Sequence, residues 1–179
     1  MLHLVPSRFG PGGVVGGAER YAEELARSMA ARVPTTLVAF GDRERRERIR
    51  GLDIWTLGHT RYVRGERHNP ISRQLFSALG TATVVHCHQQ HIAASSVAAA
   101  WCRLTGRKVF VSDLGGGGWD VSGYISTDRW FHGHLHISAY SRRVFGHEHW
   151  SRAHVILGGV DTNRFAPMPT AARRPVVLY

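Results

Sequence analysis

The feature that most constrains the fold is a strand–helix–strand pattern at the start of the chain. The apolar run at residues 2–5 predicts a buried strand, and the β-branched, apolar run at 35–40 predicts a second one. Between them, apolar residues recur at helical spacing from Ala18 to Met29, with charged residues on the opposite side. This pattern is typical of α/β proteins with a parallel sheet.

The alternation continues along the chain. Further strands are predicted at 52–57, 83–88, 109–112, 135–138 and 155–157, and further helices at 70–79, 92–104 and 139–145. The charged run 42–50 is expected to be a solvated turn or a short helix, and 59–69 an irregular loop. We therefore predict a Rossmann-like parallel sheet with helices on both faces.

Glycines and polar residues follow the predicted strands. They are Gly16 and Gly17, His86 and His88, Asp113 with the glycines of 115–118, Ser138, and Gly158 with Gly159. In open α/β sheets, ligands bind beyond the carboxyl ends of the strands. A purely structural domain would not require such residues there, so we expect a binding site along that edge.

The glycine-rich stretch at 9–17 suggests an anion site. Glycines between a strand and a helix let backbone amides approach an anion, and the helix start adds unpaired N–H groups and a positive dipole end. Gly16 and Gly17 are best placed because they directly precede Ala18. The spacing fits neither the G-x-G-x-x-G dinucleotide motif nor a P-loop. The alternative is a strand–helix turn that binds nothing.

Asp113 is the candidate catalytic residue. A carboxylate at a strand end, beside four glycines, can accept hydrogen bonds from substrate hydroxyls or steer a proton. The alternative is a carboxylate that caps the following turn. Trp119 and Asp120 come after the glycines and are predicted to close over a sugar ring, although Trp119 would serve equally as a core anchor.

His86 and His88 are two residues apart on a predicted strand, so their side chains face one side of the sheet and Cys87 faces the other. Imidazole pairs suit zinc, copper or nickel, but no second cluster with ligand spacing accompanies them, and we expect no metal. His88 is predicted to bond a substrate hydroxyl; ordinary hydrogen bonds at the sheet edge are the alternative. Three alternating histidines further on are interpreted as structural or surface residues: His132, His134 and His136.

The composition favours anionic partners. The net charge is +10 with a pI near 10.9, and it comes from arginine because Lys108 is the only lysine. Genome composition alone is an alternative source of this bias. No apolar run is long enough to span a bilayer, the start of the chain lacks the features of a signal peptide, and two cysteines indicate neither a disulfide framework nor a zinc site. A cytoplasmic setting is therefore expected.

Four segments, in order, cover nearly the whole chain: GGAER at 16–20, VVHCH at 84–88, HISAYSR at 136–142 and VILGGVDTNRFAP at 155–167. Together they resemble the N-terminal half of a retaining glycosyltransferase of the family 4 type, which has the two-domain GT-B fold. Asp113 stands where many members carry a histidine. Gly158 or Gly159 stands where the family usually has an asparagine.

The resemblance implies that a sugar passes from a nucleotide-sugar donor to an acceptor hydroxyl with retained anomeric configuration, without a cofactor or an obligatory metal. Gly16 and Gly17 would contribute backbone amides to the donor diphosphate. The remaining candidates would lie on the acceptor side: His88, Asp113, Gly115, Gly116, Trp119, Asp120 and Ser138. The acceptor would be a glycan, a lipid-linked molecule or a small molecule. A membrane-linked acceptor would suit the arginine excess, with peripheral contact at the inner face of an anionic membrane.

The resemblance also divides the chain. Residues 1–167 would form the acceptor-side domain, 168–174 a linker, and 175–179 the first strand of a C-terminal domain. In the family that second domain holds most of the sugar nucleotide, partly through a pair of glutamates, so the chain alone is expected to be inactive. One alternative is a non-catalytic module that binds phosphate or a nucleotide. A nucleic-acid-binding domain is disfavoured because the arginines are dispersed and no recognised motif is present.

Overall fold

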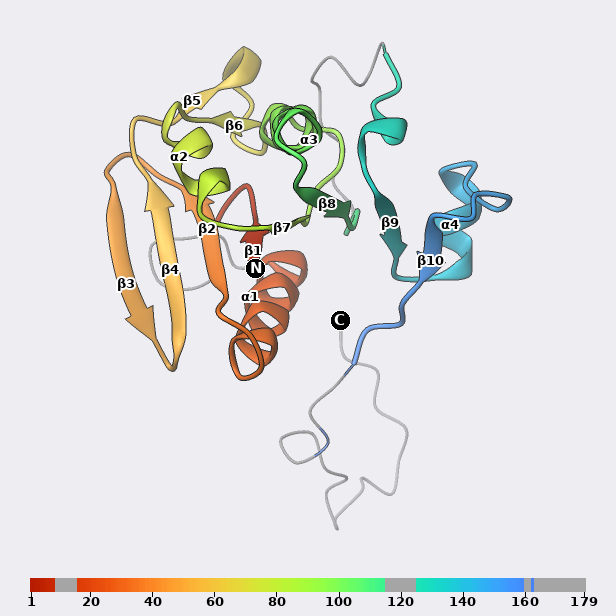
Figure 1. Ribbon diagram of the computed structural model, residues 1–179, viewed down its shortest axis with the longest axis horizontal. Coiled ribbons are helices and arrows are strands. Elements are labelled where there is room, and N and C mark those ends of the chain that lie inside the picture. Colours follow the sequence, from red (N-terminus) through yellow and green to blue (C-terminus); the bar gives the residue numbers. More distant parts are fainter. Residues whose placement is uncertain (9–15, 115–124, 160–161, 163–179) are drawn as a thin grey trace, which may run out of the picture.

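The structure is a computed structural model of the chain, and it describes residues 1–8, 16–114, 125–159 and 162. Within these residues, eight strands form one sheet in the order β10-β9-β8-β7-β1-β2-β4-β3 (Figure 1). The strands are β1 (Leu2–Leu4), β2 (Thr36–Phe40), β3 (Arg45–Ile49), β4 (Leu52–Leu57), β7 (Val84–Cys87), β8 (Lys108–Val111), β9 (Gly133–His136) and β10 (Ala153–Val155). Neighbouring strands are parallel except for β3, which pairs antiparallel with β4.

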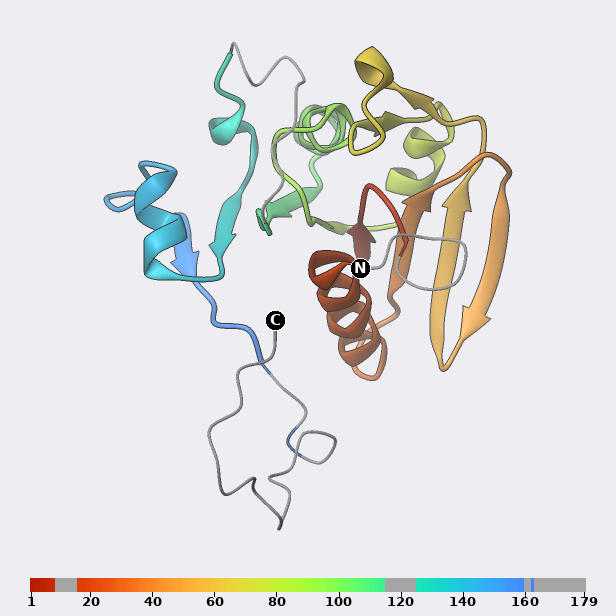
Figure 2. The ribbon, with the colours of Figure 1, turned by 180° about the vertical axis from the view of Figure 1, so that it is seen from behind.

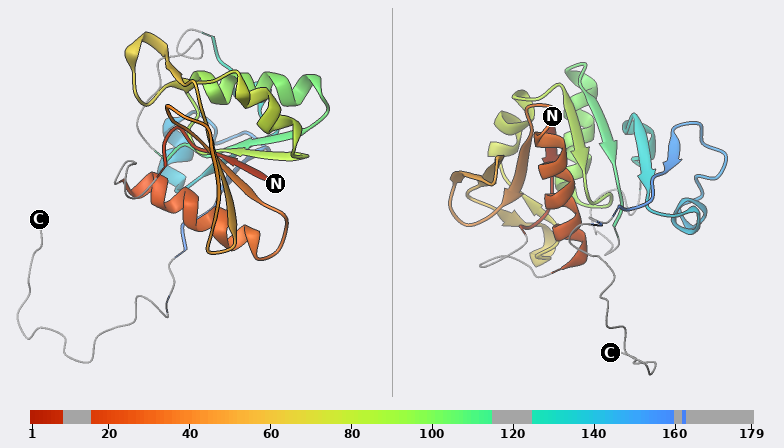
Figure 3. Two further views of the ribbon diagram at one scale, coloured as in Figure 1. Left: turned by 90° about the vertical axis from the view of Figure 1, so that its left-hand side faces the viewer. Right: turned by 90° about the horizontal axis from the view of Figure 1, so that it is seen from below.

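Helices cover both faces of the sheet, as predicted. Helix α1 (Gly17–Ala30) packs on one face, and α2 (Gln74–Gly80) and α3 (Ala93–Leu104) pack on the other (Figure 3). Helix α4 (Ala139–Val144) lies beside β9 and β10, at the end of the sheet opposite β3 (Figure 2). The chain therefore forms a Rossmann-like α/β fold with a mostly parallel sheet.

The alternation of side chains along the strands explains this arrangement. Leu37 and Ala39 of β2 pack with Ala22 and Ala26 of α1, whereas Val38 belongs to the core beneath α2 and α3. Strands β2 and β4 thus bury apolar side chains on both faces, whereas β1 and β7 place His3 and His86 on the α1 face. Double burial is why the segments of β2 and β4 are rich in apolar residues.

The charged run at 42–50 was expected to be a turn or a short helix, and that prediction was wrong. Residues 45–49 form β3, the antiparallel edge strand. Charged side chains in β3 and just before it have a partner on β4: the Arg46 guanidinium lies 3.7 Å from the centre of the Trp55 ring, and the Trp55 indole N–H donates to Glu44 at 3.1 Å. Charged residues are common on exposed edge strands because they discourage pairing with other chains.

The expected helix start at Pro70 was also wrong. Pro70 lies in β6 (Pro70–Ile71), which pairs with β5 (Arg61–Tyr62) inside the region expected to be an irregular loop. A short 3-10 helix, η1 (Val63–Gly65), follows β5. Helix α2 begins instead after Ser72, whose Oγ accepts from the Gln74 amide at 3.3 Å. The helix predicted from the apolar residues at 75–79 is confirmed. Its predicted start at Pro70 was wrong because proline also occurs in short edge strands.

Candidate functional site

The sheet order brings the predicted site residues that the structure describes to one edge. Strands β1, β7, β8, β9 and β10 are parallel neighbours, so the segments that follow them leave the same edge of the sheet. Between β1 and β7 the order of strands reverses direction: β2 and β4 lie on one side of β1, and β7 to β10 lie on the other. Ligands of open α/β sheets bind at such a switch point.

The N-terminus of α1 reaches this edge through Gly16 and Gly17. Gly16 is the N-cap in extended conformation, with no side chain to cap the first turn, and Gly17 is the first helical residue. A Cβ at Gly17 would meet nothing within 4 Å. Among the described residues, no side chain caps this 14-residue helix at its N-terminus, so the first-turn amides and the positive dipole end could receive an anion.

His88 lies directly beneath this edge, within a buried group of three histidines that we call the switch-point histidines: His3, His86 and His88. His3 of β1 is in register with His86 of β7, and all three rings lie on the α1 face of the sheet. His3 Nδ1 and His88 Nε2 are 2.8 Å apart, and His86 Nε2 is 2.8 Å from Ser112 Oγ. The predicted placement of Cys87 on the opposite face is confirmed, since Cys87 belongs to the α2 and α3 core.

Burial keeps the switch-point histidines neutral. Removal from water lowers the pKa of His3 to about 3 and the pKa of His86 to about 4. Burial also lowers the pKa of His88 well below its usual value, with further contributions from His86 and His3. The His88 ring is only 2% exposed. It is therefore a neutral, buried hydrogen-bonding group at the strand end.

Asp113 follows β8 as predicted and is buried at the same edge. The residue before it continues the sheet, because the Ser112 amide donates to the Cys87 carbonyl at 2.8 Å. The Ser112 side chain in turn holds His86. Asp113 and the switch-point histidines thus come from adjacent strands.

Ser138 follows β9 and has a structural role. Its Oγ accepts from the Ser141 amide at 3.0 Å, so Ser138 is the N-cap of α4. Four predicted site residues lie outside the described residues: Gly115, Gly116, Trp119 and Asp120.

Gly158 follows β10 and turns back toward α1. A Cβ on Gly158 would lie 3.6 Å from the Tyr21 ring. A cavity of about 190 Å³ lies on the α1 face of the sheet, between α1 and this segment. Its polar lining comes from His3, His86 and Ser112, and the rest is mainly apolar: Met1, Tyr21, Leu25, Met29, Leu135, Ile137 and Ile156.

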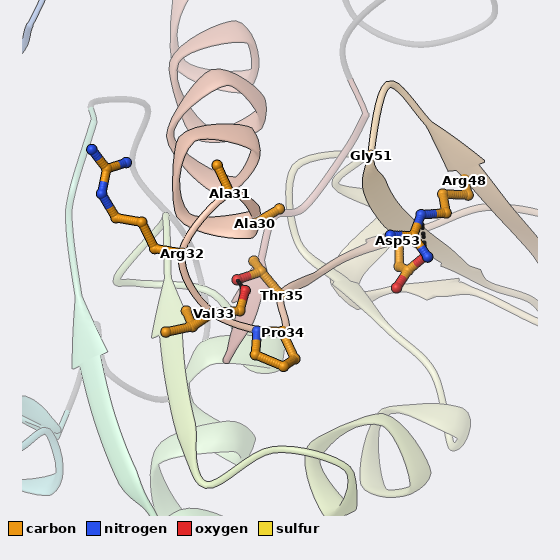
Figure 4. Close-up of a pocket in the computed structure, with 9 residues that line it drawn as sticks. All are labelled: Ala30, Ala31, Arg32, Val33, Pro34, Thr35, Arg48, Gly51 and Asp53. Carbon is orange, nitrogen blue, oxygen red and sulfur yellow. Dashed lines mark hydrogen bonds and ion pairs between the residues drawn. The ribbon is translucent and has the colours of Figure 1, made fainter.

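A second hollow, of about 410 Å³, lies near the amino ends of β2 and β4, away from the candidate site (Figure 4). Residues 30–35, between α1 and β2, line it together with Arg48, Gly51 and Asp53 of the β3–β4 hairpin. Arg48 and Asp53 form an ion pair with an N–O distance of 3.7 Å. The amino ends of the strands carry none of the predicted site residues, so this hollow is not part of the candidate site.

Two features of the histidines were not predicted from the sequence. His3 interrupts an apolar run, and only its register with His86 reveals the group of three. His134 and His136 are buried, and His136 Nε2 lies 3.1 Å from Nδ1 of the buried His147. His132 is partly exposed, and its Nδ1 accepts from the Val109 amide at 3.2 Å. Alternation at 132–136 was the visible signal, but it did not identify His147.

Within the described residues, no helix is both long and apolar enough to cross a membrane. The sheet order, with helices on both faces, defines a Rossmann-like α/β domain. Residues 15–164 match the family model described as Glycosyltransferase Family 4. The chain belongs to this family, and the matched part corresponds to its N-terminal domain. A search of curated proteins finds no match.

Proposed function

We propose that the chain is the acceptor-side half of a retaining glycosyltransferase that transfers a sugar from a nucleotide-sugar to an acceptor hydroxyl. One observation carries this proposal: the N-terminus of α1, with glycine at the N-cap, lies at the carboxyl edge of the sheet, beside the switch point between β1 and β7. Membership of glycosyltransferase family 4 supports the transferase chemistry.

The proposed contribution of α1 is electrostatic. When the bond between sugar and diphosphate breaks, negative charge develops on the leaving diphosphate. The backbone amides at Gly16 and Gly17 and the helix dipole would stabilise that charge without having to reorganise. Glu19 also lies in this first turn, and its carboxylate accepts a hydrogen bond from Ser7 Oγ at 3.3 Å, which leaves its negative charge in place.

The proposed acceptor side is formed at the ends of β7 and β8. Asp113 would accept a hydrogen bond from the acceptor hydroxyl and hold it for attack on the sugar. Beneath it, the neutral His86 and His88 would add hydrogen-bonding capacity without adding positive charge to the site. Residues 115–120 would complete this side, with Trp119 against a sugar ring and Asp120 on its hydroxyls.

The donor would be held mainly by a second α/β domain, beginning at 175 after the linker 168–174. We propose no cofactor and no obligatory metal for sugar transfer. The enzyme would act in the cytoplasm. Its arginine excess suits an acceptor at an anionic membrane surface, and the acceptor would be a glycan, a lipid-linked molecule or a small molecule.

The test is a screen of nucleotide-sugar donors and acceptors with the protein that carries both domains, followed by the Asp113→Asn variant. We expect this variant to lower the rate of transfer by about a hundredfold or more, because a positioned general base typically contributes a factor of 10² to 10⁴. The matched control is Asp53→Asn, since Asp53 is exposed at the opposite end of the sheet.

Thermal unfolding of both variants separates a lost reaction from a lost fold. Equal transfer rates for Asp113→Asn and the parent protein would contradict the role of Asp113. Binding of nucleotide without transfer or hydrolysis of any donor would contradict the enzyme and favour a phosphate-binding module.

A further inference from the structure

A second group of buried polar side chains lies away from the candidate site, near β9 and β10. One ring nitrogen of His134, one ring nitrogen of His147 and one carboxylate oxygen of Asp128 all lie within 4.8 Å of one another. The three residues come from β9, from the segment after α4, and from the short 3-10 helix η3 (Asp128–Trp130). The two imidazoles are 1–2% exposed.

The hydrogen bonds of His134 leave one nitrogen available. His134 Nε2 lies 3.0 Å from the Asp128 backbone carbonyl, which can only accept, so Nε2 carries the proton. His134 Nδ1 then presents a lone pair, and within the described residues it has no hydrogen-bond partner although it is buried. An imidazole whose second nitrogen donates to a backbone carbonyl is the usual arrangement of a metal ligand.

His147 shows the same arrangement. Its Nδ1 lies 3.1 Å from His136 Nε2, and His136 Nδ1 lies 3.3 Å from Ser141 Oγ. If each ring donates along this chain toward Ser141, His147 Nε2 carries a lone pair. That nitrogen is buried and lies 3.5 Å from Asp128 Oδ2, beyond the usual length of an N–H···O hydrogen bond. In this arrangement a lone pair faces a carboxylate, and a cation between the two would bind both; in the opposite arrangement His147 Nε2 carries a proton directed at Asp128.

The surroundings hold these ligand atoms in place. Asp128 accepts from Gln90 Nε2 at one oxygen and from Ser126 Oγ at the other, at 2.9 Å, and each oxygen keeps a second lone pair. Arg142 donates to the His147 carbonyl at 3.0 Å and fixes the backbone that carries His147. The Trp150 ring stacks on the His147 ring with centroids 4.5 Å apart and adds an apolar shell.

We propose that Asp128, His134 and His147 form a binding site for a divalent transition-metal cation of the zinc type. Two imidazole nitrogens and one carboxylate oxygen are the ligands that zinc prefers, and a water molecule would complete four-coordination. The switch-point histidines are less suited, because His3 and His88 direct ring nitrogens at each other at 2.8 Å. The ion would connect η3, β9 and the segment after α4.

The experiment titrates zinc into the chelator-treated chain and follows binding by calorimetry. We expect one zinc ion per chain, and a Tm that rises with zinc concentration because the ion binds the folded state. Cobalt substitution should produce the visible absorption of a tetrahedral site. Asp128→Asn and His147→Gln should each weaken zinc binding by about a hundredfold or more. His149→Gln, two residues from His147 and exposed, should leave it unchanged.

A second measurement does not depend on the folding of the variants. In long-range ¹H–¹⁵N NMR spectra of the parent chain, zinc should shift Nδ1 of His134 and Nε2 of His147. A failure to bind zinc would overturn the proposal. It would mean that a proton on His147 Nε2, and no metal ion, lies between His147 and Asp128. Zinc binding that survives both variants, or zinc shifts confined to other histidines, would also overturn it.

Discussion

At the scale of single residues, the distinguishing feature is the burial of imidazole. Six of the twelve histidines are buried: His3, His86, His88, His134, His136 and His147. A buried imidazole is stable when it is neutral and hydrogen-bonded, because a charged ring loses its hydration. The stability of this fold is therefore expected to depend on pH.

The switch-point histidines should make stability depend on pH. Their pKa values are lowered in the folded chain, to about 3 for His3 and about 4 for His86, whereas in the unfolded chain they are near 6.5. Below about pH 6.5 the unfolded state therefore binds protons that the folded state excludes. Their contribution to the free energy of unfolding is constant above about pH 7 and falls as the pH decreases toward about 4. Each ring contributes a slope of up to about 1.4 kcal/mol per pH unit.

Urea unfolding of the parent chain and of His86→Gln between pH 7.5 and pH 5 measures this contribution. We expect the free energy of unfolding of the variant to change less steeply with pH, by about the contribution of one histidine ring. This difference in slope should appear whatever the stability of the variant at pH 7.5. The control is His68→Gln, because His68 is exposed and should leave the slope unchanged. Identical slopes for His86→Gln and the parent chain would contradict the prediction.

At the scale of elements, local patterns were sufficient where a segment's own residues determine its structure. The strand predicted at 52–57 matches β4, because a run that is buried on both faces needs no knowledge of its neighbours. The edge strand β3 was missed, because its charged residues form a strand only through pairing with β4. The start of α2 was misplaced for the same reason, since Pro70 pairs with Tyr62 on β5.

The turn after β4 depends on a close approach of two backbones. A Cβ at Gly58 would lie 2.5 Å from the Glu44 backbone nitrogen, which cannot move without shifting the start of β3. We expect Gly58→Ala to lower the free energy of unfolding by about 1–3 kcal/mol through overpacking. Gly80→Ala is the matched control, because its Cβ would meet nothing within 4 Å and alanine favours the helix.

Chemical denaturation of the two glycine variants gives the comparison directly. Gly80→Ala should be as stable as the parent chain or slightly more stable. If Gly58→Ala were equally stable, the β3–β4 hairpin would have to be free to move away from the turn.

At the scale of the whole molecule, the sequence predicted the α/β class, the mostly parallel sheet and the strands that the described candidate residues follow. Chain order alone predicted that Asp113 and His88 follow strands; it did not predict that the His88 ring would be 2% exposed and bonded to His3. Such contacts depend on which strands become neighbours and in which register. For the same reason Asp128, His134 and His147 could not be grouped from the sequence: they are brought together by the packing of η3 and α4 around β9.

The net charge of +10 is also a property of the whole molecule. If it serves the proposed contact with anionic membranes, the chain should bind vesicles that contain anionic lipid. Binding should weaken severalfold between low and physiological salt, because exposed charges are screened over about 8–10 Å at those concentrations. Vesicle sedimentation over a salt series measures this, with neutral vesicles as the control. Binding that is absent, or that does not respond to salt, would contradict the membrane contact.

The place of β1 in the sheet has a consequence for the order of folding. β1 is made before the other strands of this sheet, yet it is central: residues 2–4 pair with 36–38 on one side and with 85–87 on the other. The unit of β1, α1 and β2 can form early, but the other edge of β1 has no partner until residues 41–83 have been added. At about 5–20 residues per second this interval is on the order of seconds. During it the nascent chain presents an unpaired, apolar strand edge, and a chain that ended before residue 84 would keep that edge open to aggregation.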